Sequence, residues 1–318
     1  MTGNWSPGAS EGHSLRWGVL GYPLFNRPDT DTDVENYRGT ARRVVKPCPF
    51  SSSAICHSAA VLLTSLSLSA QWLNYPTPGV PRTADGKPDL AAPAPRAADG
   101  KPDLSGIWAW EDNRPCPAGG CNDAKIGQEF TNIGWSLKEG LPYQRWAADL
   151  VKSRRAANAK DDPQSRCLPR GALRMHTDGL FKKIVQVPGL VVILNERNAT
   201  YRQIFTDARP LPVDPNPSWN GYSSGRWEGD TLVVQSNGFR DDTWLDSGGS
   251  PMTEGAKVTE RFRRMNFGKL EIEITVDDPK AYTQPWTVKL NQPIVVDTDL
   301  LDYICLENEK DFQHFVAK

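Results

Sequence analysis

The chain has 318 residues, a formal net charge of −1 and 38% hydrophobic residues, which is ordinary for a globular protein. A net charge this close to zero gives no electrostatic basis for binding nucleic acid or an anionic membrane, so we expect no nucleic-acid partner. The 26 prolines argue against a helical bundle, and the 11 tryptophans suit a β-rich core or a binding surface.

Residues 54–70 form an apolar run of mostly small side chains, preceded by the basic residues Arg42, Arg43 and Lys46. This order of basic, apolar and small residues is typical of a secretory signal, so we expect 44–70 to be a signal peptide. The mature protein would then be periplasmic or secreted, with no stable membrane span. A short buried helix or a membrane anchor is the alternative. Because residues 1–43 lack any periodic pattern, we expect them to be a non-native or disordered extension, with the true start at Val44 or Val45.

Residues 71–103 contain an internal duplication. The decapeptide PRTADGKPDL at 81–90 recurs as PRAADGKPDL at 95–104. The unit is too short and too rich in proline for a solenoid repeat, so we expect 71–103 to be an extended linker. The globular domain should follow at 104–318.

Six cysteines are present, and removing the leader would leave four of them, Cys116, Cys121, Cys167 and Cys305. An even number in an exported chain predicts disulfides. The short loop between Cys116 and Cys121 could close on itself, which would pair Cys167 with Cys305. Other connectivities and a zinc site are the alternatives, but the spacing fits zinc poorly, so we expect no metal.

The domain is expected to be mainly β, with one helix that begins near Pro142 and long N-terminal loops. Strands separated by short turns make an antiparallel meander, which at this length should close into a lipocalin-like barrel, with a sandwich as the alternative. The expected strands are 106–110, 183–187, 190–196, 200–206, 222–227, 231–236, 257–264, 270–277, 286–294 and 302–306.

Several stretches of the domain resemble a family of exported bacterial proteins of unassigned function. They are DPQSRCLP at 162–169, RQIFTD at 202–207, GRWEGDTLVV at 225–234, VTERFRR at 258–264 and DDPKAYTQPW at 277–286. The resemblance covers roughly residue 104 to the C-terminus and implies no particular catalytic residue. Separately, Gly106-Ile107-Trp108 resembles the G-x-W entry of lipocalin-type barrels, although the long segment between Trp110 and Phe181 departs from that pattern.

No motif of a hydrolase, metalloprotease or dinucleotide-binding enzyme is present, and we expect no cofactor. Glu260 shares a strand face with Val258 and Phe262, so it should point into the barrel. There it should be protonated, or paired with an inward donor such as Arg202, Arg226, Gln203 or a tyrosine hydroxyl. Glu260→Gln should preserve the fold but impair ligand binding or turnover. Gln203 between Tyr201 and Phe205 is expected to point inward likewise. His176 and His314 could hold a metal with nearby carboxylates, but ordinary polar roles are favoured. The loop 238–255 should be a solvated lid over the barrel mouth, with Trp244 at its centre.

Three classes of function remain open. We favour an exported protein that binds a small apolar or aromatic molecule inside the barrel, through Tyr201, Gln203, Phe205, Trp227, Trp244 and Glu260. The first alternative is an enzyme on the same barrel, with Glu260 or His176 as the candidate acid or base. The second is a structural or surface-interaction protein with a filled barrel.

Overall fold

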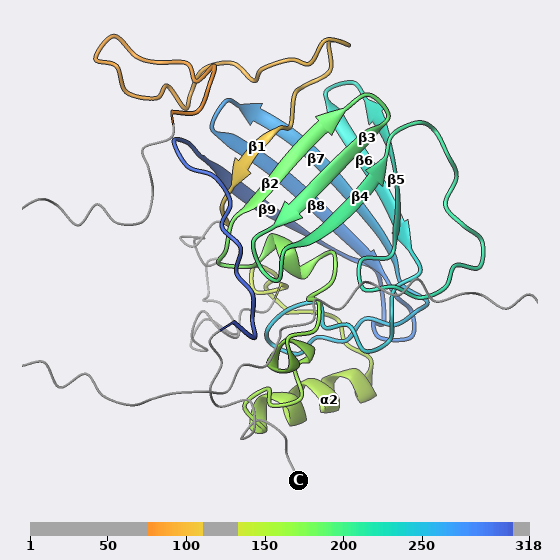
Figure 1. The fold of residues 1–318 in the computed structure, drawn as a ribbon. Helices are drawn as coiled ribbons and strands as arrows, with labels where there is room; N and C mark the ends of the chain where they lie inside the picture. Colours follow the sequence, from red (N-terminus) through yellow and green to blue (C-terminus); the bar gives the residue numbers. More distant parts are fainter. Residues whose placement is uncertain (1–75, 111–132, 308–318) are drawn as a thin grey trace, which may run out of the picture. The chain divides into compact units, whose positions relative to one another are not determined.

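The structure is a computed structural model that describes residues 76–110 and 133–307 (Figure 1). Nine strands form one closed barrel, in which each strand lies beside the next along the chain and β1 also pairs with β9. The predicted mainly β barrel is therefore confirmed. The strands are β1 (Gly106–Trp108), β2 (Lys182–Val187), β3 (Leu190–Asn195), β4 (Thr200–Phe205), β5 (Tyr222–Glu228), β6 (Thr231–Asn237), β7 (Lys257–Asn266), β8 (Lys269–Asp277) and β9 (Trp286–Val295).

Alternation of apolar and polar residues determines which face of each strand points inward. In β8, Leu270, Ile272, Ile274 and Val276 are fully buried, whereas the residues between them are partly exposed. The barrel interior is packed with such side chains, contributed by all nine strands, including Trp108 of β1 and the partly buried Trp227 of β5.

One pair of strands departs from the antiparallel meander. β4 and β5 run parallel and share a single residue pair, Phe205 with Ser224. By contrast, β3 pairs with β4 along its whole length. The long connection 206–221 carries the chain back before β5 begins, which makes the two strands parallel and leaves the barrel wall weakly joined here.

The helix α2 (Arg145–Ala156) lies outside the barrel and buries Ala147 and Val151. Two short 3-10 helices follow, η2 (Pro163–Arg166) and η3 (Arg174–His176). Figure 1 shows α2 and these turns gathered at one end of the barrel. The core includes Leu173, which precedes η3, and Met175 within it, so this segment plugs that end.

Two predicted elements differ from the structure. The strand expected at 302–306 is a turn with one isolated bridge, Tyr303 to Arg197, because β1 and β9 already close the sheet and leave no edge there. The loop 238–255 is not a solvated lid: Phe239, Trp244, Asp246 and Met252 are all buried. Its apolar residues complete the core, and the Asp246 carboxylate accepts bonds from the Ile133 and Ser250 amides.

The duplicated segment is folded rather than extended. Each copy forms the same tight loop, bridged between Arg82 and Pro88 in the first and between Arg96 and Pro102 in the second. The end of the first copy is joined to the β7–β8 turn, where the Phe267 and Gly268 amides donate to the carbonyls of Ala92 and Leu90. The second is joined to the β5–β6 turn by Arg96, whose guanidinium makes two 2.9 Å bonds to Asp230. These contacts place the segment across the opposite end of the barrel (Figure 1).

Candidate functional site

Glu260 lies in the middle of β7, opposite Val234 on β6 and Ile274 on β8. Its side chain is fully buried, as are Val258 and Phe262, so the predicted inward orientation is confirmed. The interior therefore holds a carboxylate surrounded by aliphatic and aromatic side chains. Such a group needs hydrogen-bond partners, because an unpaired buried charge is costly.

Two side chains provide those partners. Arg202 of β4 donates through Nη1 to Glu260 Oε1 at 3.0 Å and through Nη2 to Oε2. The Nε2 atom of His176, at the end of η3, lies 2.9 Å from Oε1. Arg202 thus supplies both the positive charge and the hydrogen-bond donors that the buried Glu260 carboxylate requires. We call Glu260, Arg202 and His176 the barrel cluster.

A second layer of polar groups holds the barrel cluster in place. The hydroxyls of Ser223 and Ser236 accept bonds from Arg202 at 3.1 and 3.0 Å and lie 2.9 Å from each other. The side-chain amide of Gln292 on β9 donates to the His176 carbonyl at 3.0 Å. Arg202 is thus held by hydroxyls of β5 and β6, and His176 by a side chain of β9.

The electrostatics of the barrel cluster oppose acid–base chemistry at neutral pH. Burial alone would raise the pKa of Glu260, but the Arg202 charge and the bonds from His176 and Arg202 lower it to about 2. Burial lowers the pKa of His176 to about 4, against the opposing effect of Glu260. Near pH 7 the carboxylate is therefore ionised and the imidazole neutral, and neither group titrates there. A catalytic role for Glu260 or His176 stays a prediction.

Lys182 is a further buried charge within the barrel. It opens β2, pairs across the sheet with Asn195, and is 1% exposed. Burial lowers its pKa to about 7, which the Asp178 charge only partly offsets. The interior thus carries an ammonium group without a carboxylate within salt-bridge distance among the residues that the structure describes.

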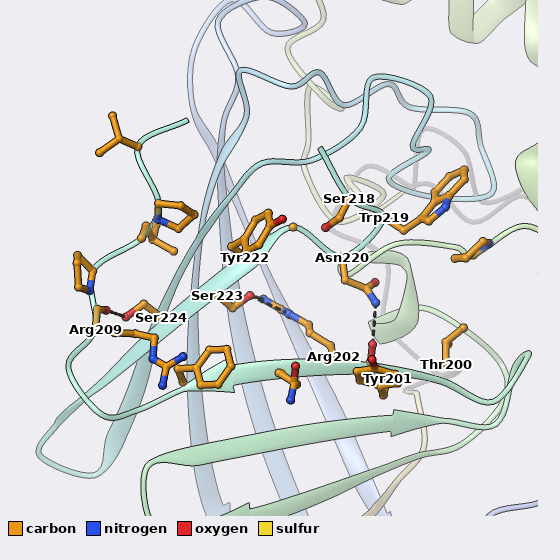
Figure 2. A pocket seen from close by; sticks show the side chains of 18 of the residues that line it. Thr200, Tyr201, Arg202, Arg209, Ser218, Trp219, Asn220, Tyr222, Ser223 and Ser224 are labelled. Atoms are coloured by element: carbon orange, nitrogen blue, oxygen red, sulfur yellow. Dashed lines mark hydrogen bonds between the residues drawn. The ribbon is translucent and has the colours of Figure 1, made fainter. Parts of the chain in front are cut away.

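A recess of about 850 Å³ opens in the barrel wall where β4 and β5 diverge. We call it the side pocket. Figure 2 shows Arg202 reaching from β4 toward Ser223 of β5 at its floor, with Tyr222 and Trp219 on the β5 side. Its apolar lining comes from Tyr201, Phe205, Pro210, Leu211, Pro212, Val213, Trp219 and Tyr222. Because Arg202 and Ser223 also line it, the floor of the side pocket is the outer edge of the barrel cluster.

The structure separates the six residues predicted to bind a ligand. Tyr201, Gln203 and Phe205 line the side pocket, whereas Trp227, Trp244 and Glu260 do not. Trp227 packs partly buried against the core. Trp244 is buried beside α2, where the Arg154 guanidinium lies 4.3 Å from its ring.

The prediction that Gln203 points into the barrel is wrong. Tyr201 and Gln203 are exposed, and the inward residues of β4 are Arg202 and Ile204. The aromatic residues beside Gln203 suggested a buried face, but Arg202 is inside because Glu260 neutralises it there. Of the donors that the sequence offers to Glu260, Arg202 is the one that pairs with it. Ser223 and Ser236 were not identified from the sequence, since their partner Arg202 lies on a distant part of the chain.

The predicted bond between Cys167 and Cys305 is confirmed, with Cα atoms 5.5 Å apart across 138 residues of chain. The Asn198 side chain braces it by bonding both the Cys167 carbonyl and the Cys305 amide. The predicted Cys116–Cys121 bond and His314 lie outside the described residues.

No protein-family model matches the chain, and no curated protein is significantly similar to it. Within residues 76–110 and 133–307, no group of three or more histidine, cysteine or acidic side chains is placed to hold a metal ion. The same residues include no helix that is both long and apolar enough to cross a membrane.

Proposed function

We propose that this protein binds a small, largely apolar or aromatic molecule in the side pocket. The observation that carries the proposal is the single residue pair between β4 and β5, which leaves a recess of about 850 Å³ in an otherwise continuous wall. Volumes of this size are typical of small-molecule sites. The proposal moves the ligand from the barrel interior, which side chains fill, to the barrel wall.

The composition of the side pocket supports this class of ligand. Aromatic and proline side chains form its walls, and Tyr201 is 60% exposed although its ring is large and mostly apolar. A few polar groups, such as Gln203 and Asn220, would orient a ligand. Such a combination of apolar walls and sparse polar groups favours a flat, weakly polar molecule.

We also propose that the protein is exported to the periplasm or secreted. The Cys167–Cys305 bond supports this location, because disulfides persist mainly in oxidising compartments. N-terminal sequencing of the mature protein from cell fractions tests it: an N-terminus near residue 70 in the exported fraction is expected, and one at Met1 in the cytoplasm would contradict it.

Titration of the purified protein with the uncharged fluorescent probe N-phenyl-1-naphthylamine tests the site. We expect Phe205→Ala and Trp219→Ala each to weaken binding about tenfold, equivalent to ~1.4 kcal/mol. The matched control is Trp146→Ala, which changes a half-exposed tryptophan in a smaller recess of about 420 Å³ beside α2. Binding that depends on Trp146 and not on Phe205 or Trp219 would overturn the proposal.

A surface-interaction protein with a filled barrel is the second candidate. The packed interior favours this candidate, since the apolar core and the barrel cluster fill the space between the described strands. The barrel would then serve as a scaffold for its outer surface. In that case Tyr201 and Tyr222 would contact a macromolecule. Mass spectrometry of small molecules that co-purify with the native protein separates the two candidates, because only the first predicts a stoichiometric ligand.

A further inference from the structure

A second recess, of about 550 Å³, lies beside η2 and η3 and shares no lining residue with the side pocket. We call it the arginine pocket. Three guanidinium groups line it, from Arg170, Arg174 and Arg197, together with only two carboxylates, from Asp162 and Asp178. Among the described residues that line it, the ionised side chains therefore sum to one positive charge without a carboxylate to match it.

Both carboxylates are already used by two of the arginines. Arg174 Nη1 and Nη2 bond the two oxygens of Asp162 at 2.8 and 2.5 Å. Arg197 Nε and Nη2 bond the two oxygens of Asp178 at 2.6 and 2.8 Å. Paired, two-bond contacts of this kind each neutralise the charge of one carboxylate. The remaining positive charge is therefore that of Arg170.

Arg170 has donors to spare. Its side chain is 14% exposed, and its one ion pair within the described chain is a 3.2 Å contact from Nη1 to Asp178, whose oxygens Arg197 already bonds. The Nε atoms of Arg170 and Arg174 are buried without a hydrogen-bond partner among the described residues. Arg174 is only 3% exposed, so its Nε is an unpartnered polar atom in a buried side chain that lines the recess.

A surplus of buried positive charge lowers the stability of the folded protein unless a negatively charged group lies nearby. A buried guanidinium with unmade hydrogen bonds loses hydration without compensation. Burial, with the nearby Arg174 charge, lowers the pKa of Arg170 to about 9, which reflects the same shortage of negative charge. An oxyanion in the recess would supply the missing negative charge and would accept bonds from the Nη atoms of Arg170, since its Nε atom is itself enclosed.

The arginine pocket is rigidly built. Arg170 follows the Cys167–Cys305 bond by three residues, and the Arg197 guanidinium stacks 4.9 Å from the Tyr303 ring, two residues before Cys305. The Ser247 hydroxyl accepts a 3.2 Å bond from Arg174, which leaves its own proton free to donate. The walls of the recess are thus fixed before any ligand arrives, which lowers the entropic cost of binding.

We infer that the arginine pocket binds one oxyanion group of a small molecule, such as a carboxylate, sulfate or phosphate, with Arg170 as its principal partner. The hydroxyl of Ser247, which also lines the recess, adds a second donor. The planar guanidinium of Arg170 suits two-bond contact with any of these anions, and the surplus of a single charge favours a monoanionic group.

Thermal unfolding and calorimetric titration of the purified full-length protein test the inference, with sodium phosphate, sulfate and acetate compared at constant ionic strength against chloride. We expect at least one oxyanion to raise the unfolding midpoint saturably, as a ligand of the folded state does. The order of the three anions distinguishes tetrahedral from planar ligands. Shifts that are equal for all salts, chloride included, would mean nonspecific screening and would overturn the inference.

Variants make the test specific. Arg170→Gln should weaken oxyanion binding at least tenfold, whereas Arg170→Lys should retain part of it. The matched control is Arg240→Gln, since Arg240 is exposed and paired with Asp242 outside the recess. Unchanged binding by Arg170→Gln would refute the site, and if that variant fails to fold, the Arg170→Lys titration decides. Binding of N-phenyl-1-naphthylamine should not respond to Arg170→Gln, so this inference and the side-pocket proposal fail independently.

Discussion

The barrel cluster and the arginine pocket both bury guanidinium groups, but they treat the charge differently. In the barrel cluster, one arginine meets one carboxylate, and two serine hydroxyls and a neutral histidine bond this pair, with only the histidine Nδ1 atom lacking a partner among the described residues. In the arginine pocket, three arginines share two carboxylates, and two Nε atoms have no partner in the described chain. The charges of the first site cancel and the site is enclosed, whereas the second site keeps one excess positive charge among its described residues and opens to a recess.

This contrast separates two uses of buried charge. A charge-balanced cluster contributes to a unique arrangement of strands, because removing either charged partner leaves an uncompensated charge. An unbalanced cluster beside a recess is instead suited to a ligand that supplies the missing charge. Substitutions should therefore destabilise the protein strongly in the first site and weakly in the second.

The largest effect is expected for Glu260→Leu. Removal of the carboxylate leaves the Arg202 charge buried and unpaired, so we expect a loss of about 3–5 kcal/mol in the free energy of unfolding, measured with urea. Although the sequence alone predicts that Glu260→Gln is tolerated, the same loss should apply to it, because an amide does not neutralise Arg202.

The double variant Arg202→Met, Glu260→Leu is the control for this loss. It removes both charges together and should recover most of the stability. Arg170→Gln, the corresponding change in the arginine pocket, should alter stability by less than about 1 kcal/mol or increase it. A double variant no more stable than Glu260→Leu would show that the cluster is not a charge-balanced unit.

The next effect is a dependence of stability on pH through His176. Its pKa is about 4 in the folded protein, below the ordinary value of 6.5, so the unfolded chain binds a proton first as the pH falls. Stability should therefore decrease between pH 6.5 and 4, by about 3 kcal/mol from this group. His176→Gln keeps a donor toward Glu260 without titrating. The difference in unfolding free energy between pH 7 and pH 4.5 should be smaller in that variant, and an equal difference would contradict the assignment.

The smallest effect is a gain in stability on Lys182→Met, which keeps the length of the side chain and removes the buried charge. The folded pKa of about 7 lies below the ordinary 10.5, so Lys182 lowers stability progressively as the pH falls from 10.5 to 7, and by a constant amount below that. We expect a gain of about 1–3 kcal/mol at pH 7, shrinking toward pH 10. A gain that does not change with pH would mean that packing, rather than charge, explains it.

Much of the barrel could be predicted because its strands carry local patterns. β8 alternates strictly, and the short turns after β2, β5 and β7 contain glycine, so strand positions and the inward face of Glu260 followed from the sequence. The parallel return between β4 and β5 was not predictable, since the 206–221 connection has no periodic pattern.

The candidate sites were harder to predict because their partners are distant in the chain. Arg202 and Glu260 are 58 residues apart, and Arg170 meets Arg197 only through Asp178. The aromatic neighbours of Gln203 favoured the wrong face of β4, since no local signal shows that a charged residue will find a buried partner. The burial of Trp244 was missed for a related reason: an irregular loop rich in glycine and aspartate resembles a solvated one.

The Cys167–Cys305 bond also changes what cleavage of the chain can do. It closes a covalent ring that contains β2 through β9, so one peptide bond cut within the ring leaves a single linked molecule. The 206–221 connection, where Val213 is fully exposed, is the natural place for a protease to act. A protein nicked there should migrate as one species without reductant and as two fragments with it. Limited proteolysis would therefore open the side pocket's outer wall while the barrel stays in one piece.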